Sequence, residues 1–97
     1  MKVEIEYDYL QKKFLGESEI LELEDGTTIG NLFRELDKRI EAAAREQGVS
    51  PKCAKFLKAD GTHACMFHVN KENPLDRLGH VLEDGDRIMI IIGFCGG

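Results

Sequence analysis

Residues 82–92 read LEDGDRIMIII, a turn sequence followed directly by an apolar strand. The segment 83–86 is built from Glu, Asp and Gly, which favour a tight turn because glycine tolerates unusual backbone angles and Asp bonds to nearby backbone. Residues 88–92 are continuously apolar and mostly β-branched. That composition is typical of a strand covered on both faces, or covered by a helix and a partner protein. We therefore expect the last strand to lie in the middle of a sheet.

Two more strands are expected in the first quarter of the chain. Apolar residues alternate with polar ones at Val3, Ile5, Tyr7 and Tyr9. This period of two predicts a strand with one buried and one solvated face. A second alternation at 21–24 follows a polar, glycine-containing stretch at 11–18 and runs into a turn at Asp25 and Gly26. We expect the two strands to pair as a hairpin.

The next segment predicts one long helix. Thr28 offers a side-chain oxygen as N-cap, and Gly48 suits the residue that ends a helix. Apolar residues between them recur at the spacing of one helical face: Ile29, Leu32, Phe33, Leu36, Ile40, Ala43 and Ala44. The charged residues largely on the other side are expected to form a solvated face: Asp37, Lys38, Glu41 and Arg45.

The signal weakens over residues 48–62, where Pro51 breaks the chain and residues 53–57 fit either a short helix or an edge strand. A third strand is predicted over residues 64–70, because Cys65, Phe67 and Val69 alternate with more polar neighbours. The apolar residues of the following crossover are expected to tuck under the sheet: Leu75, Leu78, Val81 and Leu82.

The element order is strand, strand, helix, strand, short crossover, strand. With the first and last strands side by side in the middle, it predicts an α+β fold of the β-grasp (ubiquitin-like) type, a mixed sheet with one long helix packed across it. We expect one β-grasp domain over residues 1–92 and a flexible Gly-Gly tail over residues 93–97.

Composition disfavours several classes of function. The formal net charge is -5 and the sequence pI is about 5.1, which disfavours binding to phosphate backbones. No apolar run approaches the roughly 20 residues of a membrane helix. The N-terminus lacks the pattern of a secretory signal. We expect a cytoplasmic protein that binds neither nucleic acid nor membrane, and a monomer in isolation.

The cysteines and histidines do not match a known site. Cys53, Cys65 and Cys95 are odd in number and are expected to be free thiols. A metal site could be assembled from Cys53, His63, Cys65 and His68, but these spacings match no zinc template, so we expect no metal. The chain also lacks the spacings of common catalytic motifs and a nucleotide-binding loop. We expect neither an enzyme nor a bound cofactor.

The paired glycines at the end of the chain have no evident structural use. Gly96 and Gly97 add nothing to a core and lose the most backbone entropy on ordering. Without Cβ atoms, such a terminus is thin enough to thread a narrow channel, and its carboxylate is sterically open to activation. The alternative is a frayed end with no function.

Three motifs carry a resemblance to a known family. They are the ending, which comprises residues 82–92 followed by Gly96 and Gly97, the helix start at 25–32 and the strand segment at 67–70. These motifs resemble those of the ubiquitin-like sulfur carriers of the MoaD and ThiS type. The resemblance is strongest to the small subunit of molybdopterin synthase. It covers nearly the whole chain apart from residues 48–62.

The resemblance implies a carrier rather than a catalyst. Gly97 would be adenylated by a ubiquitin-activating-type enzyme that binds ATP, and then thiocarboxylated to donate sulfur to a larger synthase subunit in molybdopterin (molybdenum or tungsten cofactor) biosynthesis. Gly96 would keep the tail slim, and docking would use the outer sheet face and the tail. The chain departs from the family's usual proline and small residues at Gly93, Phe94 and Cys95, which we expect to contact the partner.

Three alternatives share the fold. A ubiquitin-like protein modifier would join Gly97 to lysines of target proteins, and a thiamine-pathway carrier would deliver its sulfur elsewhere. A non-catalytic β-grasp interaction module would make no use of the Gly-Gly end.

Overall fold

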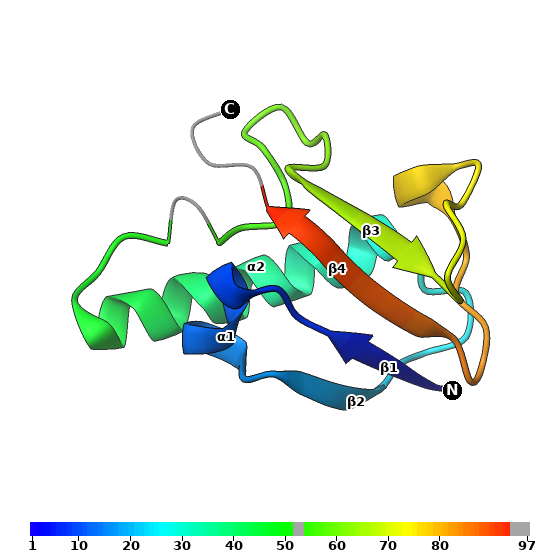
Figure 1. Ribbon diagram of the computed structural model, residues 1–97, viewed down its shortest axis with the longest axis horizontal. Helices are drawn as coiled ribbons and strands as arrows, with labels where there is room; N and C mark the ends of the chain where they lie inside the picture. The colour runs from blue at the N-terminus through cyan, green and yellow to red at the C-terminus, as the bar shows by residue number, and fades with distance from the viewer. Residues whose placement is uncertain (52–53, 94–97) are drawn as a thin grey trace.

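The computed structural model describes residues 1–51 and 54–93. The elements, in chain order, are β1 (Lys2–Glu6), α1 (Tyr9–Leu15), β2 (Ser18–Glu22), α2 (Ile29–Gln47), β3 (Cys65–Val69), the 3-10 helix η1 (Arg77–Gly79) and β4 (Arg87–Gly93). The four strands form one sheet in the order β2-β1-β4-β3, and α2 runs across one face of it (Figure 1). The predicted β-grasp fold is confirmed.

The two central strands are the first and the last, as expected. β1 pairs with β4 in parallel, with Ile5 opposite Ile88. The outer strands pair antiparallel, β2 with β1 and β3 with β4, and the second of these ladders shifts register between Met66 and Phe67. The parallel pair brings residues more than 80 positions apart into register, and each of its strands has an antiparallel neighbour on its other side.

Aromatic packing joins α2 to the sheet. Phe33 stacks on Phe56 with ring centroids 4.7 Å apart and meets the edge of Phe67 at 5.2 Å. All three rings are fully buried. The helix starts and ends where predicted, because the Thr28 side chain accepts from the Asn31 amide at 3.2 Å and Gly48 adopts a left-handed conformation at φ 70°.

The connection between β1 and β2 differs from the expectation. The chain forms the short helix α1 in place of a longer strand, and Tyr9, expected on a buried strand face, is 73% exposed. Gln11 is responsible: its side chain accepts from the Asp8 amide at 3.2 Å and donates to the Ala54 carbonyl at 2.9 Å. The second of these contacts is tertiary and satisfies the buried amide of Gln11, and alternation of apolar residues does not reveal it.

The crossover before β4 buries only half of the predicted residues. Leu82 is buried and Leu78 is partly buried, whereas Leu75 and Val81 are exposed, so the prediction was wrong for these two. Leu78 contacts the start of α2, where a Cβ on Gly30 would lie 3.1 Å from the Leu78 carbonyl oxygen. Both exposed residues lie outside η1, on the connections before and after it.

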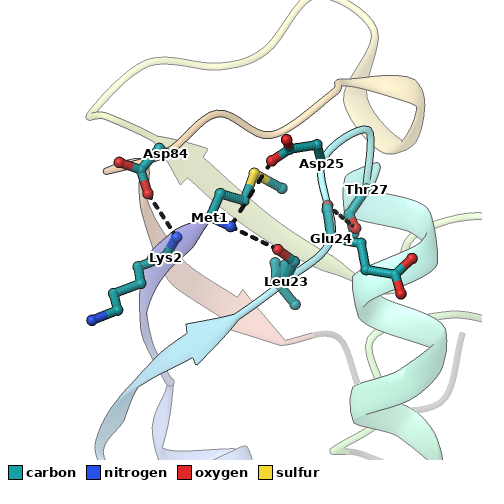
Figure 2. Close-up of polar contacts among 7 residues, drawn as sticks. All are labelled: Met1, Lys2, Leu23, Glu24, Asp25, Thr27 and Asp84. Atoms are coloured by element: carbon teal, nitrogen blue, oxygen red, sulfur yellow. Dashed lines mark hydrogen bonds and ion pairs between the residues drawn. The ribbon is translucent and has the colours of Figure 1, made fainter.

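Hydrogen bonds at the beginning of β1 connect three parts of the fold (Figure 2). The Met1 ammonium donates to the Leu23 carbonyl at 2.9 Å and lies 3.9 Å from Asp25. The Lys2 amide donates to the Asp84 carboxylate at 2.7 Å, and the Lys2 carbonyl accepts from the Gly85 amide at 2.7 Å. The turn predicted at 83–86 therefore anchors both central strands.

Among the helices of residues 1–51 and 54–93, none is long and apolar enough to cross a membrane.

Truncating a side chain should lower the stability of the protein on one face of β3 and leave it nearly unchanged on the other. Phe67→Ala removes a fully buried ring that contacts Phe33, and it should lower the free energy of unfolding by about 3–5 kcal/mol. Met66→Ala, one residue away on the open face, should change it by no more than about 0.5 kcal/mol. Urea unfolding of both variants measures the difference, and equal losses would contradict this assignment of faces.

Candidate functional site

The candidate site begins where β4 ends. Gly93 is paired with Cys65 at the start of β3 and is the last residue that the structure describes. Phe94, Cys95, Gly96 and Gly97, the other predicted site residues, lie outside the described residues. The structure therefore places the origin of the tail at the end of a central strand, beside the beginning of β3.

The sheet face opposite α2 is open over the described residues. Apolar side chains on it come from three strands, and their exposed fractions are 71% for Ile20, 39% for Met66 and 44% for Met89. We call this the outer face. Exposed apolar residues spread over neighbouring strands and bordered by polar ones are typical of a protein-binding surface.

A hollow of about 320 Å³ lies on the outer face. It is lined by Glu4, Glu6, His68, Asn70, Lys71, Arg87, Ile88 and Met89. Arg87 Nη2 lies 3.3 Å from Glu4 Oε1, and both side chains are largely in solvent. The hollow combines one exposed apolar side chain with charges of both signs, a composition suited to a polar-rimmed protein contact.

The segment that the sequence left unassigned folds back on itself before β3. Leu57 forms a bridge with His63, and the Ala64 amide donates to the Phe56 carbonyl at 2.7 Å. Residues 54–64 therefore form a hairpin that leads directly into β3. Of the two alternatives, the structure is nearer to the edge strand.

Asp37 corrects another prediction. It was expected on the solvated face of the helix, yet it is only 6% exposed. Its two carboxylate oxygens accept from the amides of Phe56 at 2.7 Å and Leu57 at 3.1 Å. Desolvation raises the pKa of Asp37, although the two amides and nearby Lys55 oppose the rise. A carboxylate is buried here because the hairpin base presents two backbone donors that need an acceptor.

A neighbouring ion pair adds to the contact between α2 and the base of the hairpin. Glu41 lies on α2 one helical turn after Asp37, and its Oε1 atom is 2.5 Å from Lys55 Nζ. That contact lowers the pKa of Glu41 and raises the pKa of Lys55. Both side chains are partly in solvent, so their pair adds less than the buried amide contacts.

Three of the four residues weighed for a metal site, which the sequence did not predict, lie within the described part of the chain. Cys65 is buried, and desolvation raises its pKa to about 12, so its thiol is not a nucleophile at neutral pH. His63 Nδ1 lies 3.0 Å from the Cys65 carbonyl oxygen, whereas His68 borders the outer hollow. Cys53 lies outside the described residues. Within residues 1–51 and 54–93, no three potential metal ligands come together.

The raised pKa of Asp37 makes its contribution to stability depend on pH. A carboxyl whose pKa is higher in the folded state stabilises the fold fully below the unfolded value of about 3.9 and loses that contribution as pH rises through the folded pKa. Asp37→Asn cannot titrate. The unfolding free energy of the wild type minus that of Asp37→Asn should therefore increase as the pH is lowered from 7 to 4. A difference that stays constant or moves the other way would contradict the raised pKa.

Comparison with known proteins identifies relatives of the whole fold. The model of the ThiS family matches residues 9–97. No curated protein matches the chain significantly in sequence. Among solved structures, the HVO 2177 protein of Haloferax volcanii has a TM-score of 0.73 at 22% identity, over 100% of this chain and 87% of that one.

Two further solved structures are similar. The putative molybdopterin converting factor, subunit 1, of Pyrococcus furiosus has a TM-score of 0.65 at 22% identity, over 93% of this chain and 94% of that one. Small archaeal modifier protein 1 of H. volcanii has a TM-score of 0.64 at 15% identity, over 92% and 93%. Identities this low establish the shared fold alone. The family match extends over nearly the entire chain, and the chain therefore belongs to the ThiS family.

Proposed function

We propose that this protein is a sulfur carrier in molybdopterin biosynthesis, with Gly97 as the residue that carries the sulfur. The observation that carries the proposal is the family match through residue 97, which includes Gly96 and Gly97. The position of β4 supports it, because a rigid central strand ends only four residues before Gly97. Because Gly93 belongs to β4, residues 1–93 then serve as the domain that a partner binds, one residue more than the sequence predicts, and residues 94–97 as the tail that the partner receives.

The proposed chemistry has two steps. A carboxylate oxygen of Gly97 attacks the α-phosphorus of ATP, forming an acyl-adenylate and releasing pyrophosphate. Hydrosulfide, or a donor equivalent to it, then attacks the acyl carbon and displaces AMP, which leaves a thiocarboxylate. The first step is needed because a free carboxylate has no good leaving group, and cations must stabilise the charge that develops on the phosphate.

The partner supplies this chemistry. Cys65, the cysteine within the described residues, is buried and its thiol has a raised pKa. The sequence also contains no nucleotide-binding loop. An adenylating enzyme of the ubiquitin-activating type binds the ATP, and a larger synthase subunit accepts the sulfur. The chain acts in the cytoplasm as a carrier without catalytic activity of its own. Gly96 keeps the tail narrow, while Gly93, Phe94 and Cys95 contact the partner.

The choice of pathway rests on the resemblance to the small subunit of molybdopterin synthase and on the similarity to the P. furiosus converting factor. The similarity to small archaeal modifier protein 1 favours a second candidate, a protein modifier joined through Gly97 to target lysines. Both functions start from the same acyl-adenylate, and they differ in the nucleophile that attacks it.

The carrier function predicts a sulfur atom on Gly97. Protein isolated from its native cells and fragmented in a mass spectrometer should show an oxygen-to-sulfur exchange in the fragment that contains Gly97. Fragment resolution is required because oxidation of methionine or cysteine adds nearly the same mass.

Removal of Gly96 and Gly97 is the matched control and should abolish the exchange without changing the unfolding temperature. Gly97 joined to lysines of other proteins, with no sulfur exchange, would favour the modifier. If neither product is found, the interaction module is the remaining alternative.

The outer face predicts a separable docking defect. Met89→Asp places a charge in the middle of the exposed apolar residues and should weaken the complex with the adenylating enzyme by about tenfold or more, since docking would desolvate this carboxylate. Val49→Asp introduces the same charge at another exposed apolar position and should leave the affinity within about twofold. Isothermal titration calorimetry compares them, and equal effects would show that the outer face is not the docking surface.

A further inference from the structure

The hairpin at residues 54–64 is secured at its base by several buried contacts. Phe56 lies in the aromatic core against Phe33, and Asp37 accepts from the amides of Phe56 and Leu57. Gln11, itself fully buried, donates to the Ala54 carbonyl at 2.9 Å. Contacts from α1 and α2 therefore hold one short segment in a single position.

The far end of the hairpin is ordered by its own hydrogen bonds. The Lys58 amide donates to the Thr62 carbonyl at 2.8 Å, and the Gly61 amide donates to the Lys58 carbonyl at 2.9 Å. Asp60 accepts from both the amide and the hydroxyl of Thr62, at 3.0 Å and 2.6 Å. Gly61 takes the φ of 86° that this turn requires. We call residues 58–62 the exposed turn.

This turn contributes little to the fold that carries it. All five residues are exposed, and the hydrogen bonds of the Asp60 and Thr62 side chains stay within the turn. An exposed turn that its own hydrogen bonds already order is suited to recognition, because the partner does not have to order it on binding.

The turn also lies at the same end of the sheet as the exit of the tail. The hairpin runs directly into Cys65, and Cys65 pairs with Gly93 at the end of β4. Figure 1 shows the segment before β3 beside the arrowhead of β4, whereas η1 (yellow) lies at the opposite end of that strand. The seven residues of β4 separate the two ends by about 20 Å.

We propose that the exposed turn at residues 58–62, positioned by Asp37, is a recognition element that the adenylating enzyme contacts while it receives the tail. The inference rests on the proposed function and adds a second contact to it, separate from the outer face and from the tail. An enzyme that draws in the tail must approach this end of the sheet, where it meets the turn. Lys58 is the one cation of the turn and Asp60 its one anion, so the matching enzyme surface offers hydrogen-bonding or charged groups for both.

A double variant tests the turn without disturbing its hydrogen bonds. Lys58→Ala with Ala59→Arg moves the cation by one residue and adds bulk at the neighbouring exposed position, so the net charge of the chain stays the same. The matched control is Arg34→Ala with Leu75→Arg, the same kinds of change at exposed residues near the other end of the sheet. Asp37→Asn tests the positioning residue.

The measurement is pyrophosphate release by the adenylating enzyme encoded in the same genome, with each full-length variant as substrate. The turn variant should raise KM about tenfold with kcat within twofold and an unchanged unfolding temperature, and the control should behave as the wild type. Asp37→Asn should raise KM as well. Covalent fusion of each carrier variant to the enzyme makes adenylation independent of binding affinity, so the fused variants should all release pyrophosphate at the same rate.

Two failures are distinguishable. If the wild type is adenylated and the turn variant matches it in KM, the recognition role of the turn is wrong and the carrier function stands. If the wild type releases no pyrophosphate, the proposed function fails and the inference fails with it.

Discussion

The packing of Phe33 against Phe56 and Phe67 is the contact on which the rest of the structure depends. Phe33 comes from α2, Phe67 from β3, and Phe56 from the hairpin between them, so one cluster joins helix, sheet and connection. The three rings are fully buried, and burial of rings this size is among the largest favourable contributions in a chain of 97 residues. With the helix held on one face, the opposite face of the sheet remains open over the described residues.

The polar contacts around this cluster connect the core to the proposed site. Asp37 and Gln11 are both buried, and both accept or donate at the base of the hairpin that precedes β3. Because β3 begins beside the end of β4, the same contacts position the place from which the tail leaves. The cost of desolvating Asp37 is offset by two backbone donors that would otherwise be unsatisfied in the core.

Sequence reasoning succeeded where a residue's environment follows from local pattern. The helix between Thr28 and Gly48 and the central position of β4 were predicted, because capping chemistry and continuous β-branched residues depend on near neighbours. It failed for Tyr9, Asp37, Leu75 and Val81. Tyr9 continues an alternation that the Gln11 contact interrupts, and Leu75 is an exposed apolar residue on the connection before η1, where no helix or strand periodicity sets its direction.

For the site, the chain alone pointed to Gly96 and Gly97 and to the family, because a slim terminus and motif order are properties of sequence. The sequence by itself determined the order of elements, the long helix and the central last strand, since these arise from short-range periodicity and turn chemistry. Only the tertiary structure decided that Asp37 is buried and that the hairpin stands at the end of the sheet where β4 finishes. Those features arise from backbone donors and strand ends that are distant in the chain and meet only after folding.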